Sequence, residues 1–363
     1  MEKLSIGVIG CGGIAFGKHL PALKKQEDVR LTAFCDIIPE RAQRAAKEYG
    51  CEGAEVFTDY RALLETKPDV VCVLTPNRQH APITVAALEA GAHVMCEKPM
   101  AIDSAGARAM LEASRRTGKS LTIGYQNRFR PDSRYLKRCI EAGDLGEIYY
   151  ARAQAIRRRA VPTWGVFLDA ENQGGGPLID IGTHALDLTL WLMDNYEPDM
   201  VVGTTFRKLA DRENAANAWG PWDPKKYAVE DSAFGYIRMK NGAAIVLESS
   251  WALNTLLVDE AKTILCGTLG GADMLGPKDN PLRINGERFS ELYTTIPQLG
   301  GEGVDFYDPS GAARPEDLEA RMWLDHVLDS SKPLVTRPEQ ALVVTEILEA
   351  IYTSQKTGKP VFF

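Results

Sequence analysis

The 363-residue sequence lacks the features that mark membrane proteins and nucleic-acid-binding proteins. No apolar run approaches the roughly 20 residues of a membrane-spanning helix. The formal net charge of −7 also argues against a nucleic-acid partner, whose binding protein would carry a basic surface. We therefore expect a protein that binds neither a membrane nor a nucleic acid.

Paired cysteine motifs are missing as well. The seven cysteines are scattered, no CxxC pair occurs, and several lie in apolar, strand-like runs. This pattern favours reduced, buried thiols over a disulfide framework or a zinc site. The five histidines form no recognisable metal-binding motif, so we expect no metal. The N-terminus leads directly into a strand pattern without a signal peptide, which predicts a cytoplasmic protein.

The first third of the chain alternates between short apolar runs and helix-like stretches. The runs are rich in Val, Ile, Leu and Cys, and their lack of polar alternation predicts strands that are buried on both faces. We predict strands over 4–9, 30–35, 70–74, 93–96 and 120–123, and helices over 14–25, 39–49, 83–90 and 104–117. This alternation indicates an α/β fold with a doubly wound parallel sheet.

The first predicted strand ends in the turn Gly10-Cys11-Gly12-Gly13-Ile14-Ala15, which matches the GxGxxA form of the dinucleotide fingerprint. Gly10 permits the tight turn, Gly12 lets the backbone approach a pyrophosphate, and Ala15 allows close helix packing. The amides that begin the helix, at Gly13 and Ile14, then face the phosphates. A doubly wound domain that binds another nucleotide, or none, is the alternative.

Asp36 ends the second predicted strand and completes the predicted cofactor site. Its carboxylate can accept hydrogen bonds from the ribose hydroxyls of a dinucleotide. The same negative charge would repel a 2′-phosphate, which favours NAD over NADP. Arg41 is the nearest arginine after Asp36 and the one residue that argues for NADP.

Two polar motifs follow later strands, at the sheet edge where such folds place ligands. They supply the remaining candidate cofactor contacts, which are Thr75, Asn77, His80, Glu97 and Lys98. Lys98 can polarise a substrate oxygen or share its proton, and the alternative is a surface ion pair with Glu97. His80 is either a cofactor contact or a capping and packing residue.

Residues 174–187 carry the most unusual pattern of the second half of the chain. The segment 177–193 predicts a largely apolar helix, yet Asp180, His184 and Asp187 recur on one of its faces. Ionisable groups on an apolar helix are costly unless they are paired or used. Asp180 and His184 therefore form either an acid/base pair or a satisfied core histidine with a helix cap.

The rest of the chain predicts a second domain. We predict strands over 148–155, 232–239, 243–251 and 262–266, with a hairpin at Asn241-Gly242, and helices over 132–142 and 338–357. These elements indicate a mostly antiparallel open sheet with one face against helices. We expect the other face, near Trp251, to be a subunit interface. The predicted domains are 1–124 and 125–363, with packing of the final helix back on the first domain as an option.

Three further stretches supply candidate substrate contacts. Residues 124–129 lead out of the first domain, an arginine run precedes a Trp-Gly pair, and a loop around 219–224 carries two tryptophans. Exposed tryptophans can stack on sugar faces, or they can hold a loop to the body of the protein. The arginines either border a cleft or form a solvated face. The candidates are Tyr125, Asn127, Arg128, Arg158, Trp164 and Trp222.

In this order, these motifs resemble those of the Gfo/Idh/MocA oxidoreductases, and the resemblance covers nearly the whole chain. It implies a Rossmann domain that binds NAD(P), followed by an α/β domain whose open sheet supports homodimers or homotetramers. It also implies that Lys98, Asp180 and His184 surround the reacting carbinol, with His184 as the acid/base.

The resemblance further implies hydride transfer between nicotinamide and a carbinol carbon of a sugar, glycoside or cyclitol, carbon 3 of a hexose or glucoside being one such position. One alternative is a redox-neutral, NAD-dependent glycosidase or lyase that passes through a keto-sugar. Another is a non-catalytic nucleotide sensor, against which the presence of Lys98, Asp180 and His184 argues.

Overall fold

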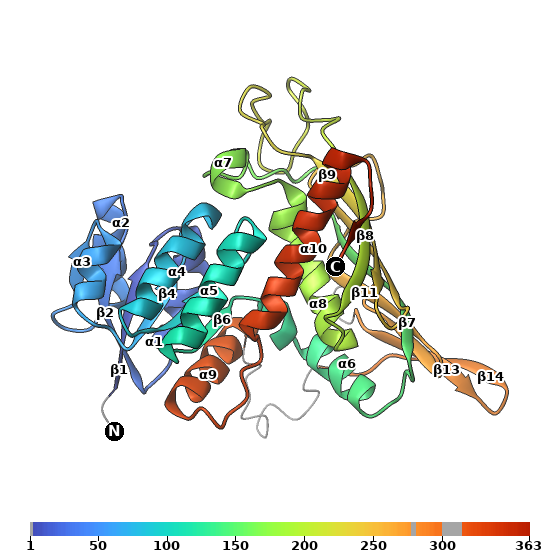
Figure 1. Cartoon of the computed structure of the whole chain (residues 1–363), viewed down its shortest axis with the longest axis horizontal. Helices are drawn as coiled ribbons and strands as arrows, with labels where there is room; N and C mark the ends of the chain where they lie inside the picture. Colours follow the sequence, from blue (N-terminus) through green and yellow to red (C-terminus); the bar gives the residue numbers. More distant parts are fainter. Residues whose placement is uncertain (1–2, 277–280, 300–313) are drawn as a thin grey trace. The chain divides into compact units, whose positions relative to one another are not determined.

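The computed structural model describes residues 3–276, 281–299 and 314–363 (Figure 1). The chain divides into two compact units. The first unit comprises Met1–Gln126 and Ala313–Leu342, and the second comprises Asn127–Ala312 and Val343–Phe363. Among the described residues, no helix has both the length and the apolar character needed to span a membrane.

The first unit contains a parallel sheet with the strand order β3-β2-β1-β4-β5-β6. The order reverses between β1 and β4, and doubly wound sheets place ligands at such a switch point. The prediction of a doubly wound parallel sheet is therefore confirmed. The strands are β1 (Leu4–Ile9), β2 (Val29–Cys35), β3 (Glu55–Phe57), β4 (Val70–Val73), β5 (His93–Cys96) and β6 (Leu121–Ile123).

The helix predicted over 14–25 begins with a π-helical segment, η1, and continues as α1. π-Helical turns are rare and occur frequently at functional sites. The helical elements of the first unit are η1 (Ala15–His19), α1 (Leu20–Lys24), α2 (Pro39–Tyr49), α3 (Tyr60–Glu65), η2 (Asn77–Gln79), α4 (His80–Glu89), α5 (Ser104–Thr117) and α9 (Pro315–Leu328). The chain leaves this unit through the 3-10 helix η3 (Gln126–Phe129).

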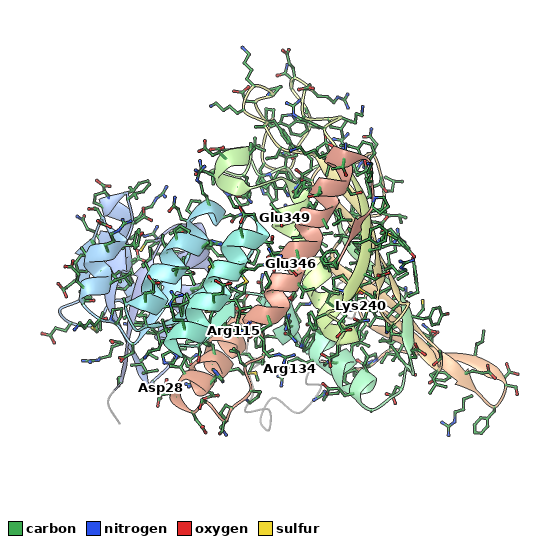
Figure 2. All side chains as sticks on the ribbon, in the orientation of Figure 1. Asp28, Arg115, Arg134, Lys240, Glu346 and Glu349 are labelled. Atoms are coloured by element: carbon green, nitrogen blue, oxygen red, sulfur yellow. The ribbon has the colours of Figure 1, made fainter. Side chains whose placement is uncertain are left out.

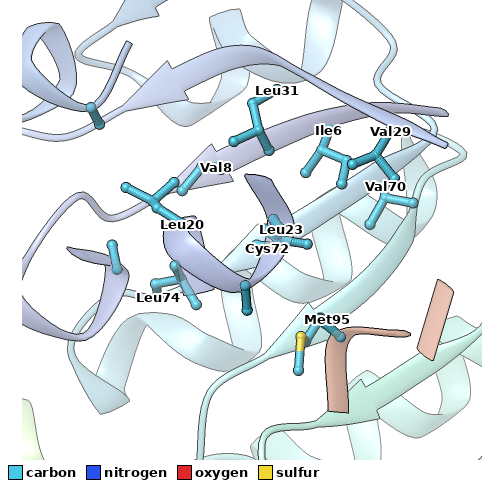
Figure 3. Close-up of a cluster of buried hydrophobic side chains, with 14 of the residues drawn as sticks. Ile6, Val8, Leu20, Leu23, Val29, Leu31, Val70, Cys72, Leu74 and Met95 are labelled. Carbon is cyan, nitrogen blue, oxygen red and sulfur yellow. The ribbon is translucent and has the colours of Figure 1, made fainter. Parts of the chain in front are cut away.

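Helix α9 comes from the last part of the sequence but packs on the core of the first unit. Its side chains Trp323 and Leu324 belong to the same buried cluster as Ile6 and Leu20, part of which Figure 3 shows. At the rim, Arg321 pairs with Asp28, which is labelled in Figure 2, at 2.8 Å. The first unit is thus completed by residues about 200 positions beyond its last strand.

The second unit contains an open sheet with the order β14-β13-β12-β11-β7-β10-β9-β8-β15. Within this second sheet, β7–β10 is the one parallel pair among the described strand pairs, so the predicted mostly antiparallel sheet is confirmed. The strands are β7 (Ile148–Ile156), β8 (Pro198–Phe206), β9 (Ser232–Met239), β10 (Ala244–Ser250), β11 (Asp259–Gly267), β12 (Gly270–Asp273), β13 (Arg283–Arg288), β14 (Glu291–Thr295) and β15 (Val361–Phe362). Gly242, with φ +90°, turns the predicted hairpin between β9 and β10.

Helices cover one face of this sheet, and the other face is open. Ile351 packs directly on Gly203 of β8 and Gly235 of β9, whereas Val202 and Tyr236 point to the opposite face and are exposed. The helices are α6 (Pro131–Glu141), α7 (Ala170–Gln173), the π-helical η4 (Leu178–Gly182), α8 (Thr183–Met193) and α10 (Pro338–Thr357). Trp251 is fully buried, so its predicted place on the open face is wrong.

Candidate active site

The glycine turn at the switch point has the geometry that a dinucleotide site needs. Gly10 has φ +94°, and a Cβ atom there would lie 2.6 Å from the backbone of Leu74, so only glycine fits. At Gly12 and Gly13 a Cβ atom would meet no atom of the described residues within 4 Å. The backbone is therefore accessible on the side where a pyrophosphate would approach. Ala15 is fully buried, as close helix packing requires.

The Asp36 carboxylate holds this turn in place. Its Oδ2 accepts a hydrogen bond from the Cys11 amide at 2.8 Å, and its Oδ1 accepts one from the Ile38 amide at 2.9 Å. Each carboxylate oxygen can accept a second hydrogen bond, so Asp36 can still receive ribose hydroxyls. Arg41 is exposed to solvent.

An orphaned polar atom also lies beside the switch point. The Oγ1 atom of Thr75, just after β4, is buried and has no hydrogen-bond partner within the part of the chain that the structure describes. Buried hydroxyls normally find a partner, and a bound ligand can supply one. The glycine turn, Asp36 and Thr75 together fit NAD, with Ile14 exposed at the helix start and Asn77 buried in η2.

His80 is buried and contacts the loops that follow two strands. Its Nε2 lies 2.9 Å from the Thr75 carbonyl oxygen and its Nδ1 lies 2.7 Å from that of Pro99. Burial lowers the pKa of His80, so the neutral ring donates to one carbonyl at a time. His80 thus ties the loop after β4 to the loop that carries Lys98, and we leave it out of the proposed cofactor contacts.

Glu97 stands at the centre of a buried charge cluster next to Lys98. Its Oε1 accepts hydrogen bonds from Lys18 Nζ and His19 Nε2, both at 2.7 Å, and its Oε2 accepts one from the Lys98 amide at 3.0 Å. Lys18 Nζ also lies 3.0 Å from Glu319 Oε2 of α9. Because Glu97 is 5% exposed, the alternative of a surface ion pair with Lys98 is wrong. Glu97 positions the Lys98 backbone.

The cluster perturbs the titration of its members. Burial alone would raise the pKa of Glu97, but Lys18 and His19 hold it well below its ordinary value. Burial lowers the pKa of His19. Burial raises the pKa of Glu319 to about 7, against the opposing effect of Lys18. Lys18, His19 and Glu319 were not among the predicted site residues. Two polar residues inside an otherwise apolar helix were a signal for Lys18 and His19, but nothing local pointed to Glu319.

In the second unit, the three ionisable residues of the η4–α8 segment have different environments. Asp187 is fully buried and receives Arg128 Nη2 at 2.6 Å and Nε at 2.9 Å. Burial raises the pKa of Asp187, against the effect of Arg128. Asp180 is 5% exposed, and its Oδ2 accepts the indole N–H of Trp251 at 3.0 Å. His184 is partly exposed, and its Nδ1 atom is buried.

The start of this segment depends on a further buried carboxylate, which was not among the predicted site residues. Glu230 accepts hydrogen bonds from the amide of Gly176 at 2.8 Å and from the hydroxyl of Tyr352 at 2.9 Å. A Cβ atom at Gly175 would lie 2.1 Å from that hydroxyl, and one at Gly176 would lie 2.2 Å from the Glu230 carbonyl oxygen. The glycines therefore permit close packing ahead of Asp180.

The remaining candidate substrate residues separate into buried and exposed groups. Trp222 is 3% exposed and donates its indole N–H to the Ala210 carbonyl at 2.9 Å, so it holds its loop to the body. Arg128 is committed to Asp187, and Tyr125 is 1% exposed. We leave Trp222, Arg128 and Tyr125 out of the proposed substrate contacts. The residues that reach solvent are Asn127, Arg158 and Trp164.

Comparison with known proteins agrees with this architecture. Residues 4–125 match the family model "Oxidoreductase family, NAD-binding Rossmann fold", and residues 137–363 match "Oxidoreductase family, C-terminal alpha/beta domain". The chain belongs to the Gfo/Idh/MocA family of oxidoreductases, and its first unit is an NAD-binding Rossmann domain. Among the described residues, no group of three or more His, Cys, Asp or Glu side chains could hold a metal ion.

Individual relatives span most or all of the chain. D-glucoside 3-dehydrogenase of Escherichia coli K12 is 38% identical over 98% of this chain and 97% of its own length. Levoglucosan dehydrogenase of Pseudarthrobacter phenanthrenivorans is 28% identical over 69% of this chain and 68% of its own length. A solved levoglucosan dehydrogenase complex with NADH and levoglucosan has a TM-score of 0.80 at 22% identity, covering 99% of both chains. This last likeness concerns the fold.

Proposed function

We propose that the protein uses NAD to oxidise a ring hydroxyl of a glycoside, at carbon 3 of a glucoside. The relative that supports this substrate is the D-glucoside 3-dehydrogenase, which aligns over nearly the full length of both chains. The observation that carries the proposal is the environment of His184. It is the partly exposed imidazole on a segment whose Asp180 and Asp187 are both buried and hydrogen-bonded.

In the proposed mechanism, bound NAD supplies the hydride acceptor. His184 accepts the proton of the reacting hydroxyl, because a partly exposed imidazole can exchange that proton with solvent afterwards. Lys98 stabilises the substrate oxygen as negative charge develops on it. Asp180, fixed by Trp251, orients the substrate or His184.

The glycine turn, Asp36 and Thr75 are the proposed cofactor contacts. The open space beside Gly12 and Gly13 receives the pyrophosphate, and Asp36 receives the ribose hydroxyls. Thr75 offers its Oγ1, which lacks a partner among the described residues, to the dinucleotide. Asp36 favours NAD over NADP through its negative charge.

The experiment is a spectrophotometric screen of inositols, free hexoses, and methyl and phenyl glucosides with the purified protein and NAD. We expect NADH to accumulate in proportion to product with a glucoside, and NMR to place the new ketone at carbon 3. Glycoside cleavage without net NADH would instead indicate the redox-neutral glycosidase. Turnover of inositols alone, or of no sugar in the panel, would overturn the proposal.

We further propose that copies of the chain associate through the open face of the second-unit sheet. Val202, Phe206 and Tyr236 are exposed there, and apolar side chains on an open sheet are typical of subunit interfaces. Light scattering of the wild type and of Tyr236→Glu tests this, with a smaller species expected for the variant. The seven free cysteines support a reducing compartment such as the cytoplasm.

A further inference from the structure

Two tryptophans of the second unit form an exposed pair outside the proposed catalytic group. Trp164 and Trp219 are 51% and 46% exposed. Their ring centroids lie 4.9 Å apart and their planes meet at 85°, an edge-to-face arrangement. Large aromatic side chains that gather at a surface mark binding sites more often than isolated apolar residues do.

The loops that carry this pair are joined by several hydrogen bonds. The Val161 amide donates to Asn217 Oδ1 at 2.8 Å, and Asn217 Nδ2 donates to the Val161 carbonyl at 2.9 Å. The Thr163 hydroxyl donates to the Trp219 carbonyl at 3.0 Å. The guanidinium of Arg157 also lies 5.6 Å from the Trp219 ring centroid. The rings are thus held before any ligand arrives, which reduces the entropy lost on binding.

A row of aromatic contacts leads from this pair to Asp180. Trp164 contacts the Phe167 ring at 5.8 Å between centroids, and Phe167 contacts the Trp251 ring at 6.3 Å. The Trp251 indole then donates to Asp180 Oδ2 at 3.0 Å. The exposed pair and the carboxylate are therefore two ends of one packed row within the second unit.

We propose that Trp164 and Trp219 form a subsite for the ring attached to the oxidised sugar. That ring is either an aromatic aglycone or a second pyranose, since both present an apolar face that stacks on indole. This inference rests on the proposed function, because it assumes that the sugar undergoing oxidation lies at Asp180 and His184. Trp222, buried in the same loop, serves only to hold it.

The test compares kcat/KM for phenyl glucoside, a glucose disaccharide, methyl glucoside and free glucose. In the wild type we expect a preference for the two substrates that carry a second ring. Trp164→Ala and Trp219→Ala should each lower kcat/KM for these substrates about 10-fold, with methyl glucoside changed less than about 2-fold. A higher kcat/KM for phenyl glucoside indicates a subsite for an aryl aglycone, and a higher value for the disaccharide indicates a subsite for a second sugar.

Two controls make the result specific. Phe289→Ala removes an aromatic ring that is 85% exposed at the β13–β14 turn, and it should leave all four values unchanged. Trp164→Tyr keeps an aromatic face and should retain most of the preference. Circular dichroism and melting temperature establish that each variant is folded.

Equal losses on all four substrates, or an unchanged preference in both tryptophan variants, would overturn the subsite. Calorimetric titration of phenyl glucoside separates this outcome from a failure of the proposed function. If the wild type binds phenyl glucoside but releases no NADH, the proposed oxidation fails, and weaker binding in Trp164→Ala still supports the subsite. If Trp164→Ala binds it as tightly as the wild type does, or the wild type does not bind it, the subsite is absent.

Discussion

Glu97 in the first unit and Asp180 in the second are both buried carboxylates near a proposed catalytic group, but Glu97 lies in a compact cluster of charges whereas Asp180 lies on a helical segment. Glu97 receives two cationic or ionisable side chains, Lys18 and His19, as well as the Lys98 amide. Asp180 receives the neutral indole of Trp251.

The two units differ in how their buried ionisable groups are arranged. In the first unit, opposite charges compensate one another and the cluster fixes a backbone. In the second unit, the ionisable groups are distributed along one helical segment: Asp180 pairs with an indole and Asp187 with Arg128, while His184 reaches solvent. The cluster in the first unit fixes the backbone of Lys98. On the helical segment of the second unit, the buried carboxylates fix positions and His184 carries the proposed proton transfer.

The largest effect should follow removal of the two groups assigned to chemistry. We expect Lys98→Ala and His184→Ala each to lower kcat about 10²–10⁴-fold without loss of fold, because they assist proton movement and charge development. NADH production at saturating NAD and glucoside measures this. Lys240→Ala, at an exposed lysine labelled in Figure 2, is the matched control. A wild-type rate in either variant would remove that residue from the mechanism.

The free energy of unfolding should show that Asp187, on α8, has a structural role. Arg128→Met leaves Asp187 buried without its guanidinium and should lower the free energy of unfolding by about 3–5 kcal/mol. Arg238→Met removes an exposed partner of Asp199 and should change it by less than about 1 kcal/mol. Urea denaturation measures both. Equal effects would show that the buried pair is no more important than a surface pair.

The charge cluster around Glu97, which includes Glu319, predicts that the stability of the folded protein depends on pH. The pKa of Glu319 is about 7 in the folded protein against an ordinary 4.5, so the folded state binds its proton more tightly. Stability should therefore fall as pH rises from about 4.5 to 7, by up to about 3 kcal/mol. Glu319 faces Lys18, Glu97 and Glu316.

Replacing the Glu319 carboxyl should make the stability of the protein less dependent on pH. We expect the melting temperature of Glu319→Gln minus that of the wild type to increase from pH 5 to pH 8. Glu339→Gln, at an exposed carboxylate that pairs with Arg115, should follow the wild-type curve. Parallel curves for Glu319→Gln and the wild type would mean that folding does not raise the pKa of Glu319.

The smallest effect concerns the cofactor. Asp36→Arg removes the acceptor of the ribose hydroxyls and adds a cation suited to a 2′-phosphate, so NAD affinity should fall about 10–100-fold and NADP binding should improve. Fluorescence titration with NADH and NADPH measures the change. Because Asp36 also accepts the Cys11 amide, Asp36→Asn serves as a control that keeps an acceptor. An unchanged preference for NAD over NADP would show that Asp36 does not bind the ribose.

Sequence patterns predicted the elements with strong periodicity and missed the weak ones. The bounds of β1, β5, β9, α2, α5 and α10 agree with the predicted ranges. Strand β3 was missed because two of its three residues are exposed, which leaves no apolar run. The π-helical turn of η4 was also missed, since it forms where Glu230 meets the amides of Gly176 and Leu178 from a distant part of the chain.

The site was predictable where chemistry is local in the sequence. The glycine turn and Asp36 were identified from spacing alone, and the structure brings them together. The pairing of Lys18 with Glu319 joins residues about 300 positions apart, and no local pattern encodes it. Likewise, Trp222 and Trp219 lie in one irregular loop without periodicity, so their opposite exposures were not predictable.

The glycines ahead of Asp180 have a practical consequence for altering which glycosides are accepted. Any side chain at Gly175 or Gly176 would collide with Tyr352 or the Glu230 backbone, so mutant libraries that include these positions would consist largely of misfolded proteins. Positions 164 and 219 instead carry rings that are about half exposed. Selection for new aglycones is therefore best directed at the tryptophans, with both glycines kept constant.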